Sequence, residues 1–491
     1  MSRDPGTGGR IIKGSFWILG LELSNQGLQF LKTFYAANIL TPQDFGVVGL
    51  AFLVIGFIEI LSTTGMKEAI MQRKETHPFF LDTAYIIEVA KGIVVFGLCL
   101  LLSAFLGSFI ASPGEFAPGV IRVIGLIYLL QCSINIGVLY FEKDIQFHRF
   151  FIYQFAGTFT DVVVSIVLVY YLENVWALFY GVIGGGIARV IFSFLLSRHK
   201  TRFNFSLAHA REMYHYGKHI FRGRFFNFIG LQADSVIVTS FFNTYALGVY
   251  QMAFRIGNLP MSQVSNIIGR IAFPAFSSVH DEEIRLKHYF LNFTNVLLIA
   301  IIPVVIGISV AIDKFVAVFL GSQWQDTIPI VRLLVFAGFL RMIVSLVDTL
   351  FCALGKPKVS SELQFVRFLV FIIVIGPLGY FFGIIGVASS AVVSLAVVLF
   401  IFFRKAMKTL AVSPAEFATT IIEPICFGLF IAASSLILLR SLNFSDLLEF
   451  MILTAFVIAS YLGVGMILSR YSNFKIFSKA ILLIQSYRNK S

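Results

Sequence analysis

The sequence predicts an all-α polytopic membrane protein, and two observations carry that prediction. The mean hydropathy is +0.87 and only 13% of residues are charged, whereas soluble domains carry about 25% charged residues. Apolar stretches long enough to cross a bilayer, which takes roughly 20 residues, fill most of the chain, and Lys and Arg fall largely into alternate gaps between them. Little protein is therefore left outside the membrane to form a soluble catalytic domain.

We expect about 14 transmembrane helices, because each stretch holds roughly 20 or more mostly apolar residues. The first of them is the least hydrophobic, and its polar residues argue against a cleaved signal. The expected spans are 14–37, 45–64, 84–111, 118–141, 151–172, 175–197, 216–241, 246–274, 288–312, 328–353, 362–382, 384–403, 418–439 and 447–468.

The basic residues between the spans predict the orientation of the chain. If the N-terminus is cytoplasmic, nearly all Lys and Arg outside the spans lie on the cytoplasmic side, and only Lys314 and Arg440 lie on the outer side. Basic loops stay in the cytoplasm, so both termini are expected there, in a bacterial inner membrane. This asymmetry, together with the attraction of basic loops to anionic lipid, accounts for the net charge of +12 without a nucleic-acid partner.

Charged and polar residues inside the spans predict a hydrated central cavity with a positive balance. They recur every three or four residues, as a helix face requires, and an ionised group facing lipid would cost about 2.5–3.5 kcal/mol. The alternative is a tight bundle held by interhelical hydrogen bonds and ion pairs. The candidate cavity residues are Arg255, Lys32, Arg341, Arg224, Arg122, Gln29 and Asn25, and the carboxylates that could carry a coupling ion, or pair structurally with a base, are Asp234, Asp161 and Asp348.

The chain contains an internal repeat. Residues 39–52 (ILTPQDFGVVGLAF) resemble residues 241–254 (FFNTYALGVYQMAF), with Gly46, Val47, Ala51 and Phe52 identical to the residues 202 positions later (248 − 46 = 202). The repeat predicts two parallel six-helix lobes, 1–200 and 201–410, around a central cavity, and leaves two additional helices and a cytoplasmic tail in 411–491. Two such lobes are typical of alternating-access transporters.

Three motifs resemble the polysaccharide transporter branch of the MOP flippase superfamily, and most closely its Wzx-type exporters of colanic acid and teichuronic acid. They are LTPQDFGVV (40–48), AFRIGNLP (253–260) and FPAFS (273–277). The resemblance covers about 1–410 well and the remaining chain more loosely. It implies a flippase that moves an undecaprenyl-pyrophosphate-linked oligosaccharide from the cytoplasmic to the outer leaflet for lipopolysaccharide or exopolysaccharide assembly. It also implies a cationic cavity that receives the pyrophosphate. Arg255 lies within a matched motif, so that role carries over to it most directly.

Several other functions remain open at this point. A peptidoglycan lipid-linked precursor flippase would share the fold and the cationic cavity, whereas a multidrug antiporter of the superfamily would favour an anionic cavity. A membrane glycosyltransferase or polymerase would usually carry a larger outer loop. No phosphate loop or nucleophile motif is visible, so we expect no catalytic residue, no enzyme activity and no cofactor, although coupling to protons or sodium is open.

The expected partners follow from the same considerations. They are the lipid-linked glycan, membrane lipids and a polysaccharide polymerase with its export machinery. No pair of the four cysteines has the spacing of a metal site or disulfide framework. His215 and His219 stand four residues apart, but interfacial polar residues are the more ordinary explanation, so no metal is expected.

Overall fold

The computed structural model describes residues 7–62, 70, 78–109, 117–144, 146–197, 199–202, 204–207, 209–211, 232–441 and 444–471. All regular structure within these residues is helical, which confirms the predicted all-α fold. The chain separates into two compact units, an N-terminal unit (Met1–Gln251) and a C-terminal unit (Met252–Ser491). The lobe boundary predicted at residue 200 stays a prediction.

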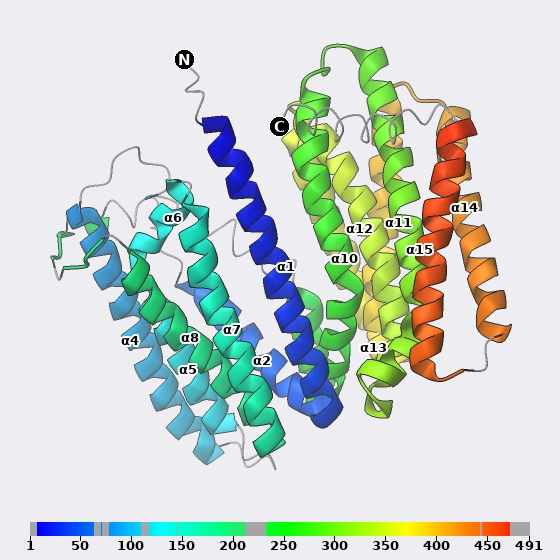
Figure 1. Cartoon of the computed structure of the whole chain (residues 1–491). Coiled ribbons are helices and arrows are strands. Elements are labelled where there is room, and N and C mark those ends of the chain that lie inside the picture. Colours follow the sequence, from blue (N-terminus) through cyan, green and yellow to red (C-terminus); the bar gives the residue numbers. More distant parts are fainter. Residues whose placement is uncertain are drawn as a thin grey trace. The chain divides into compact units, whose positions relative to one another are not determined.

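The N-terminal unit is a bundle of long helices (Figure 1). Helix α7 packs between α1 and α8, and α4 packs on α5. The elements are α1 (Thr7–Ile39), α2 (Pro42–Leu61), α4 (Pro78–Phe109), α5 (Ala117–Cys132), η1 (Ile136–Val138), α6 (Leu139–Lys143), α7 (Phe147–Leu172), α8 (Trp176–Leu196) and the first turns of α10 (Thr244–Ser277).

The C-terminal unit holds the rest of α10 and the remaining long helices. Helix α12 packs against both α11 and α13, while α14 and α15 pack on α11. The elements are α11 (Glu283–Phe319), η2 (Ser322–Trp324), α12 (Thr327–Ala353), α13 (Pro357–Thr409), α14 (Pro414–Ser441) and α15 (Asp446–Tyr471).

Each predicted span except 118–141 and 216–241 coincides with one of these helices or with part of one. Most of 216–241 lies outside the described residues. Among the described residues, eight helices are long and apolar enough to cross a membrane, or nine if one bent pair forms a single span. The protein is therefore polytopic, and the count of 14 stays a prediction.

The span expected at 118–141 is not one continuous helix. It consists of Pro118–Cys132 and Ile136–Lys143, which meet at a bend of 60°. Asn135 causes the break locally: its side chain accepts a hydrogen bond from the backbone N–H of Gly137 at 2.8 Å, which starts the new turn. Asn side chains compete with the helical hydrogen bonds in this way.

The long element α13 contains two of the predicted spans. Its 53 residues would measure about 80 Å if straight, well over the roughly 30 Å of a hydrocarbon core. Gly383 interrupts it with a φ of 60° and a ψ of −140°. A Cβ on Gly386 would lie 1.9 Å from the carbonyl oxygen of Leu378, although eight residues of straight helix would separate them by about 12 Å. The chain therefore turns sharply at Gly383.

The two copies of the repeated motif begin their helices in the same way. Thr41 caps α2, with its hydroxyl accepting from the Asp44 backbone N–H at 3.3 Å while the Asp44 carboxylate accepts from the Thr41 backbone N–H at 2.9 Å. Asn243, which is 202 residues after Thr41, accepts from the Ala246 backbone N–H at 2.9 Å. The LTPQD stretch is thus a capping box with Pro at the first helical position.

The glycines of the two motifs bring the starts of α2 and α10 into backbone contact. A Cβ on Gly46 would lie 1.8 Å from the carbonyl oxygen of Thr244, and a Cβ on Gly248 would lie 1.7 Å from that of Pro42. Only glycine permits this approach, which explains why both positions hold it.

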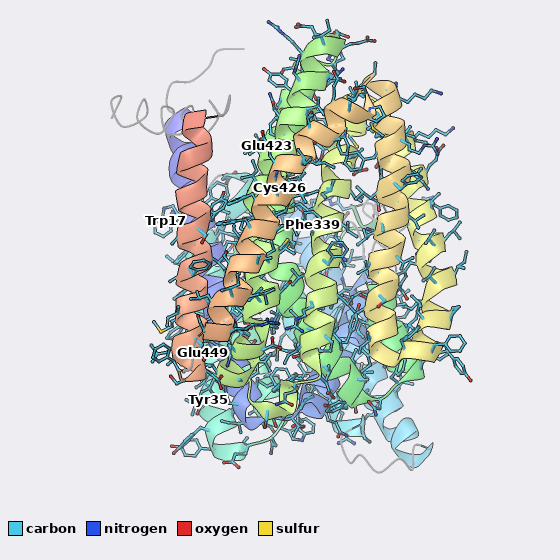
Figure 2. The ribbon with its side chains drawn as sticks, turned by 90° about the vertical axis from the view of Figure 1, so that its right-hand side faces the viewer. Trp17, Tyr35, Phe339, Glu423, Cys426 and Glu449 are labelled. Atoms are coloured by element: carbon cyan, nitrogen blue, oxygen red, sulfur yellow. The ribbon has the colours of Figure 1, made fainter. Side chains whose placement is uncertain are left out.

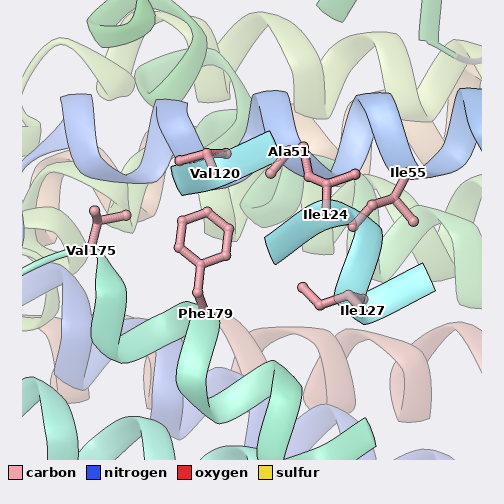
Figure 3. Packing of buried hydrophobic residues seen from close by; sticks show 7 residues of the cluster. All are labelled: Ala51, Ile55, Val120, Ile124, Ile127, Val175 and Phe179. Atoms are coloured by element: carbon pink, nitrogen blue, oxygen red, sulfur yellow. The ribbon is translucent and has the colours of Figure 1, made fainter. Parts of the chain in front are cut away.

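A cluster of apolar side chains packs between α2, α5 and α8 in the N-terminal unit (Figure 3). Phe179 of α8 is 1% exposed there. The other buried members are Ala51, Ile55, Val120, Ile124, Ile127 and Val175. Since lipid gives helices no hydrophobic reason to associate, such close van der Waals contacts hold the bundle together.

Three ion pairs join α11 to the last helices, whose side chains Figure 2 shows. Lys314 lies 2.7 Å from Asp446 and 2.6 Å from Glu449 of α15. Toward the other end of α11, Lys287 lies 2.7 Å from Glu416 of α14. Hydrogen bonds from Lys287 and from the Ser413 backbone lower the pKa of the Glu416 carboxyl to about 2, so this pair stays ionised at neutral pH.

Candidate functional site

Lys32 and Asp161 form a buried ion pair between α1 and α7. The ammonium of Lys32 lies 2.8 Å and 3.0 Å from the two carboxylate oxygens of Asp161. Gln29 donates to the same carboxylate at 2.9 Å, and Ser165 donates at 3.3 Å. The sequence predicted Lys32 and Gln29 as cavity residues and Asp161 as a carboxylate that could carry a coupling ion. The structure brings the three into one hydrogen-bonded network.

Glycines of α8 enclose this network. A Cβ on Gly181 would lie 1.8 Å from the hydroxyl of Ser165, and a Cβ on Gly185 would lie 2.7 Å from the Cβ of Asp161. The side chains of Lys32 and Asp161 are only 11% and 7% exposed. The pair therefore lies in a region of low polarity, where each charge depends strongly on the other.

The interaction within this pair depends on whether the Asp161 carboxylate is charged. While Asp161 is ionised, it holds the ammonium of Lys32 in place. Neutralising the carboxylate, by a proton or a competing cation, would remove a charge partner of the buried Lys32. One turn before Gln29, the side-chain oxygen of Asn25 is buried, and it accepts no hydrogen bond within the described part of the chain.

A second polar centre, in the C-terminal unit, surrounds Arg341 of α12. Its guanidinium donates to the side-chain oxygen of Asn258 at 2.7 Å and lies 5.9 Å from the ring centre of Phe254. Both contacts come from α10, so the face of α12 that carries Arg341 packs against the face of α10 that carries Asn258. An aromatic face and one amide thus help to orient the guanidinium of Arg341.

Arg367 of α13 adds a second cation to this centre. It interacts electrostatically with both Arg341 and Asp348, and the Asp348 carboxylate accepts a hydrogen bond from Ser360. The guanidiniums of Arg341 and Arg367 and the carboxylate of Asp348 thus belong to one charged centre in a partly buried place. Planar guanidiniums bind phosphate oxygens in pairs, so this arrangement suits a phosphate or pyrophosphate group.

Sequence reasoning did not place Arg367 in the site. The signal was present, because Ser360, Gln364 and Arg367 are spaced by four and three residues, as on one helix face. The long apolar run that follows them outweighed this short stripe.

The other candidate residues lie apart from these two centres or outside the described residues. Arg255 is exposed on α10. Arg122 is exposed on α5 and donates to Ser103 at 3.1 Å. Asp234 accepts from the Tyr250 hydroxyl at 2.7 Å. Arg224, His215 and His219 lie outside the described residues.

Comparison with known proteins identifies the family of this chain. The model of the family described as "Polysaccharide biosynthesis protein" matches residues 36–329. The lipopolysaccharide biosynthesis protein WzxC of Escherichia coli is 24% identical over 382 residues, covering 77% of each chain. The teichuronic acid biosynthesis protein TuaB of Bacillus subtilis is 23% identical over 356 residues, covering 72% of this chain and 73% of its own.

Solved structures share the fold. The lipid II flippase MurJ in an inward closed conformation superposes with a TM-score of 0.69 at 14% identity, covering 94% of this chain and 99% of its own. An inward-facing multidrug resistance transporter of the MATE family, within the MOP superfamily, superposes with a TM-score of 0.62 at 16% identity, covering 79% and 96%. These likenesses concern the fold alone. The family match, across more than half of its length, shows that the chain belongs to the polysaccharide biosynthesis protein family.

Proposed function

We propose that the protein flips an undecaprenyl-pyrophosphate-linked oligosaccharide from the cytoplasmic to the outer leaflet by alternating access. The observation that carries the proposal is the pair of arginines in the C-terminal unit, where Arg367 interacts electrostatically with both Arg341 and Asp348. The names of the relatives support it, because they refer to the biosynthesis of lipopolysaccharide and teichuronic acid and, for a protein of Rhizobium meliloti, to succinoglycan transport.

The cargo explains why such a centre is needed. A pyrophosphate carries about two negative charges, and stripping water from an unpaired charge is very costly in hydrocarbon. Arginines in a hydrated cavity replace that water with directed, charge-assisted hydrogen bonds. The lipid tail stays in the bilayer, so no covalent chemistry is required. On this proposal Arg341 and Arg367 receive the pyrophosphate and Arg255 assists its entry.

The buried pair of Lys32 and Asp161 suits the coupling of this movement to an ion. A proton or sodium ion that neutralised Asp161 would release Lys32, and a base released in this way could then attract the anionic cargo. Asp348 is the second candidate for the carboxylate that carries the coupling ion, because it interacts electrostatically with Arg367. Asp234 is the third, with its hydrogen bond from Tyr250.

We further propose that the two repeats form six-helix lobes, 1–200 and 201–410, and that 411–491 adds two helices and a cytoplasmic tail. The protein would lie in a bacterial inner membrane with both termini in the cytoplasm. Its partners would be membrane lipids and a polysaccharide polymerase with its export machinery.

Topology is tested by reporter fusions along the chain. Fusions after residues 42, 173, 243 and 383 should report outside, and fusions after 75, 145, 205, 283, 357, 408 and 485 should report inside, because basic loops remain in the cytoplasm. Alkaline phosphatase and a fluorescent protein would serve as paired reporters. A run of consecutive fusions with the opposite sign would contradict the fourteen-span arrangement.

The cargo and the two arginines are tested together. Deleting the gene should cause one lipid-linked glycan to accumulate in the inner leaflet, where mass analysis of extracted lipids identifies it. Returning the Arg341→Ala or Arg367→Ala variant should restore export at a rate roughly tenfold to hundredfold below wild type, since a hydrogen bond to a charged group contributes about 1.5–3 kcal/mol. Arg341→Lys should recover part of the loss, because it keeps the charge but not the planar fork.

Arg332→Ala is the matched control. It lies on the same helix, half-exposed and paired with Asp313, and should export normally. Wild-type export by the Arg341→Ala and Arg367→Ala variants at wild-type abundance would rule out the cationic-centre mechanism. Accumulation of a peptidoglycan precursor, altered drug susceptibility alone, or sugar transfer by the purified protein would instead identify one of the three alternative functions.

A further inference from the structure

A cavity of about 260 Å³ lies inside the N-terminal unit, at the break between α5 and α6. Helix α4 contributes Tyr85 and Glu88 to its wall, α6 contributes Glu142, and α7 contributes Tyr153 and Gln154. It is separate from the Arg341 centre, which belongs to the other unit. Neither the comparisons nor the proposed mechanism assigns it a role.

The wall at the break is held in place by hydrogen bonds that do not involve a ligand. The Asn135 backbone N–H donates to the Ser193 hydroxyl at 3.0 Å, and its side chain donates to the carbonyl of His199 at 3.2 Å. The Tyr85 hydroxyl donates to the carbonyl of Ser133 at 3.4 Å. The cavity is therefore largely preformed, as binding pockets usually are.

Other polar groups at the cavity have no partner within the protein. Tyr153 is 4% exposed, yet its hydroxyl makes no hydrogen bond within the described part of the chain and is not sealed from solvent. Since Tyr153 lines the cavity, the hydroxyl opens into it. The side-chain amides of Gln131 and Gln154 line the same cavity and, among the described residues, are likewise unpaired. A buried polar group normally has a hydrogen-bond partner, which the Tyr153 hydroxyl lacks within the described part of the chain. Gln154 is half-buried and Gln131 is exposed, so their amides are accessible to a ligand.

The charges around the cavity balance. Glu88 is paired with Lys91 at 2.5 Å, while Glu142 and Arg189 both act electrostatically on Tyr153. Among the residues that the structure describes, no Lys or Arg lines the cavity. A phosphate would therefore meet carboxylates rather than bases, and an organic cation would gain little from a neutral environment. A lipid tail would leave the amides and the hydroxyl unsatisfied.

Aromatic rings complete the lining. Phe150 and Tyr153 lie 6.4 Å apart between ring centres, and Tyr85 lines the opposite wall from α4. A pyranose ring has this combination of needs, because its C–H face packs on aromatic rings while its hydroxyls both donate and accept. The volume is below the roughly 300–1,000 Å³ of pockets that enclose drug-sized ligands, which suits one sugar ring rather than an oligosaccharide.

We infer that this cavity binds one neutral monosaccharide unit of the glycan. The inference rests on the proposed function in taking the sugar to belong to the cargo. Lys143 at the end of α6 and Arg149 in the first turn of α7 are next in sequence to the lining residues Glu142 and Phe150, so we expect this end of the cavity on the predicted cytoplasmic side. The glycan is therefore recognised by its sugar before or during loading, apart from its pyrophosphate.

The test uses the purified full-length protein in lipid nanodiscs and ligand-detected NMR. Glucose, galactose and N-acetylglucosamine are the neutral probes, glucuronate and inorganic pyrophosphate the anionic probes, and choline the cationic probe. At least one neutral sugar should bind to the wild type. Tyr153→Phe should weaken that binding roughly twofold to tenfold, as the loss of one neutral hydrogen bond predicts, and Gln154→Leu should weaken it further.

Tyr170→Phe is the matched control, because Tyr170 is an exposed tyrosine of the same helix and should bind like wild type. Absence of binding by all neutral sugars, preferential binding of choline or of an anion, or equal binding by the Tyr153→Phe, Gln154→Leu and Tyr170→Phe variants would overturn the inference. The proposed function is judged separately by lipid analysis of the deletion strain. Sugar binding without accumulation of a lipid-linked glycan would support the cavity and refute the transport, and accumulation without sugar binding would do the reverse.

Discussion

The Asp161→Ala variant is expected to be less stable than wild type by about 3–5 kcal/mol, because it leaves the ammonium of Lys32 buried without its partner. The carboxylate also accepts hydrogen bonds from Gln29 and Ser165, and these would be lost. Thermal unfolding of the purified protein in detergent, followed by tryptophan fluorescence, would measure the change. Asp281→Ala is the control, since the Asp281 side chain is 86% exposed and its removal should have little effect.

A paired replacement separates structure from coupling. Changing Lys32 to Met together with Asp161 to Leu removes both charges, and apolar replacements of a buried pair are often neutral or stabilising. The double variant should therefore regain most of the stability. If it is folded but its export no longer depends on protons or sodium, the pair carries the coupling. A single variant as stable as wild type would contradict the burial argument.

The Gly248→Ala variant is expected to separate the starts of α2 and α10. Its Cβ would lie 1.7 Å from the carbonyl oxygen of Pro42, and a backbone atom cannot rotate aside. Overpacking typically costs about 1–3 kcal/mol, and this contact lies at the severe end. We expect a lower unfolding temperature and reduced export, measured on the same preparations, and the same result for Gly46→Ala.

Gly97→Ala provides a control of opposite sign. A Cβ at Gly97 in α4 would meet no atom within 4 Å, so alanine there should stabilise the helix by up to about 1 kcal/mol. Equal unfolding temperatures for Gly97→Ala and Gly248→Ala would show that the helix contact is looser than the distances indicate.

Local patterns predicted most of the helices. Apolar runs of bilayer length located the spans, and the LTPQD stretch has the residues of a capping box, with which α2 begins. The bend after Cys132 was missed because a single Asn, within an otherwise apolar run, produces it. Hydropathy averages over a window and does not register such a residue.

The sequence predicted which helix faces carry polar residues, but not which of these faces contact each other. Stripes identified Lys32 and Asp161 separately, but the two are 129 residues apart, and periodicity on one helix does not say which helix lies opposite. For the same reason the sequence predicted that Lys32 lines the cavity but did not indicate its contact with Asp161. Arg367 and the cavity beside Tyr153 depend on three or more helices meeting, and that information is in the tertiary structure alone.

The contact between the two repeated motifs is reciprocal. Gly46 approaches Thr244 and Gly248 approaches Pro42, and both pairs are related by the same shift of 202 positions (244 − 42 = 202). Each copy thus uses one surface to meet the same surface of the other, as the subunits of a two-fold symmetric dimer do. One local two-fold axis therefore constrains both copies at once: a side chain added at either glycine meets the carbonyl supplied by the other. A duplicated sequence that diverges elsewhere must keep this pair of glycines together.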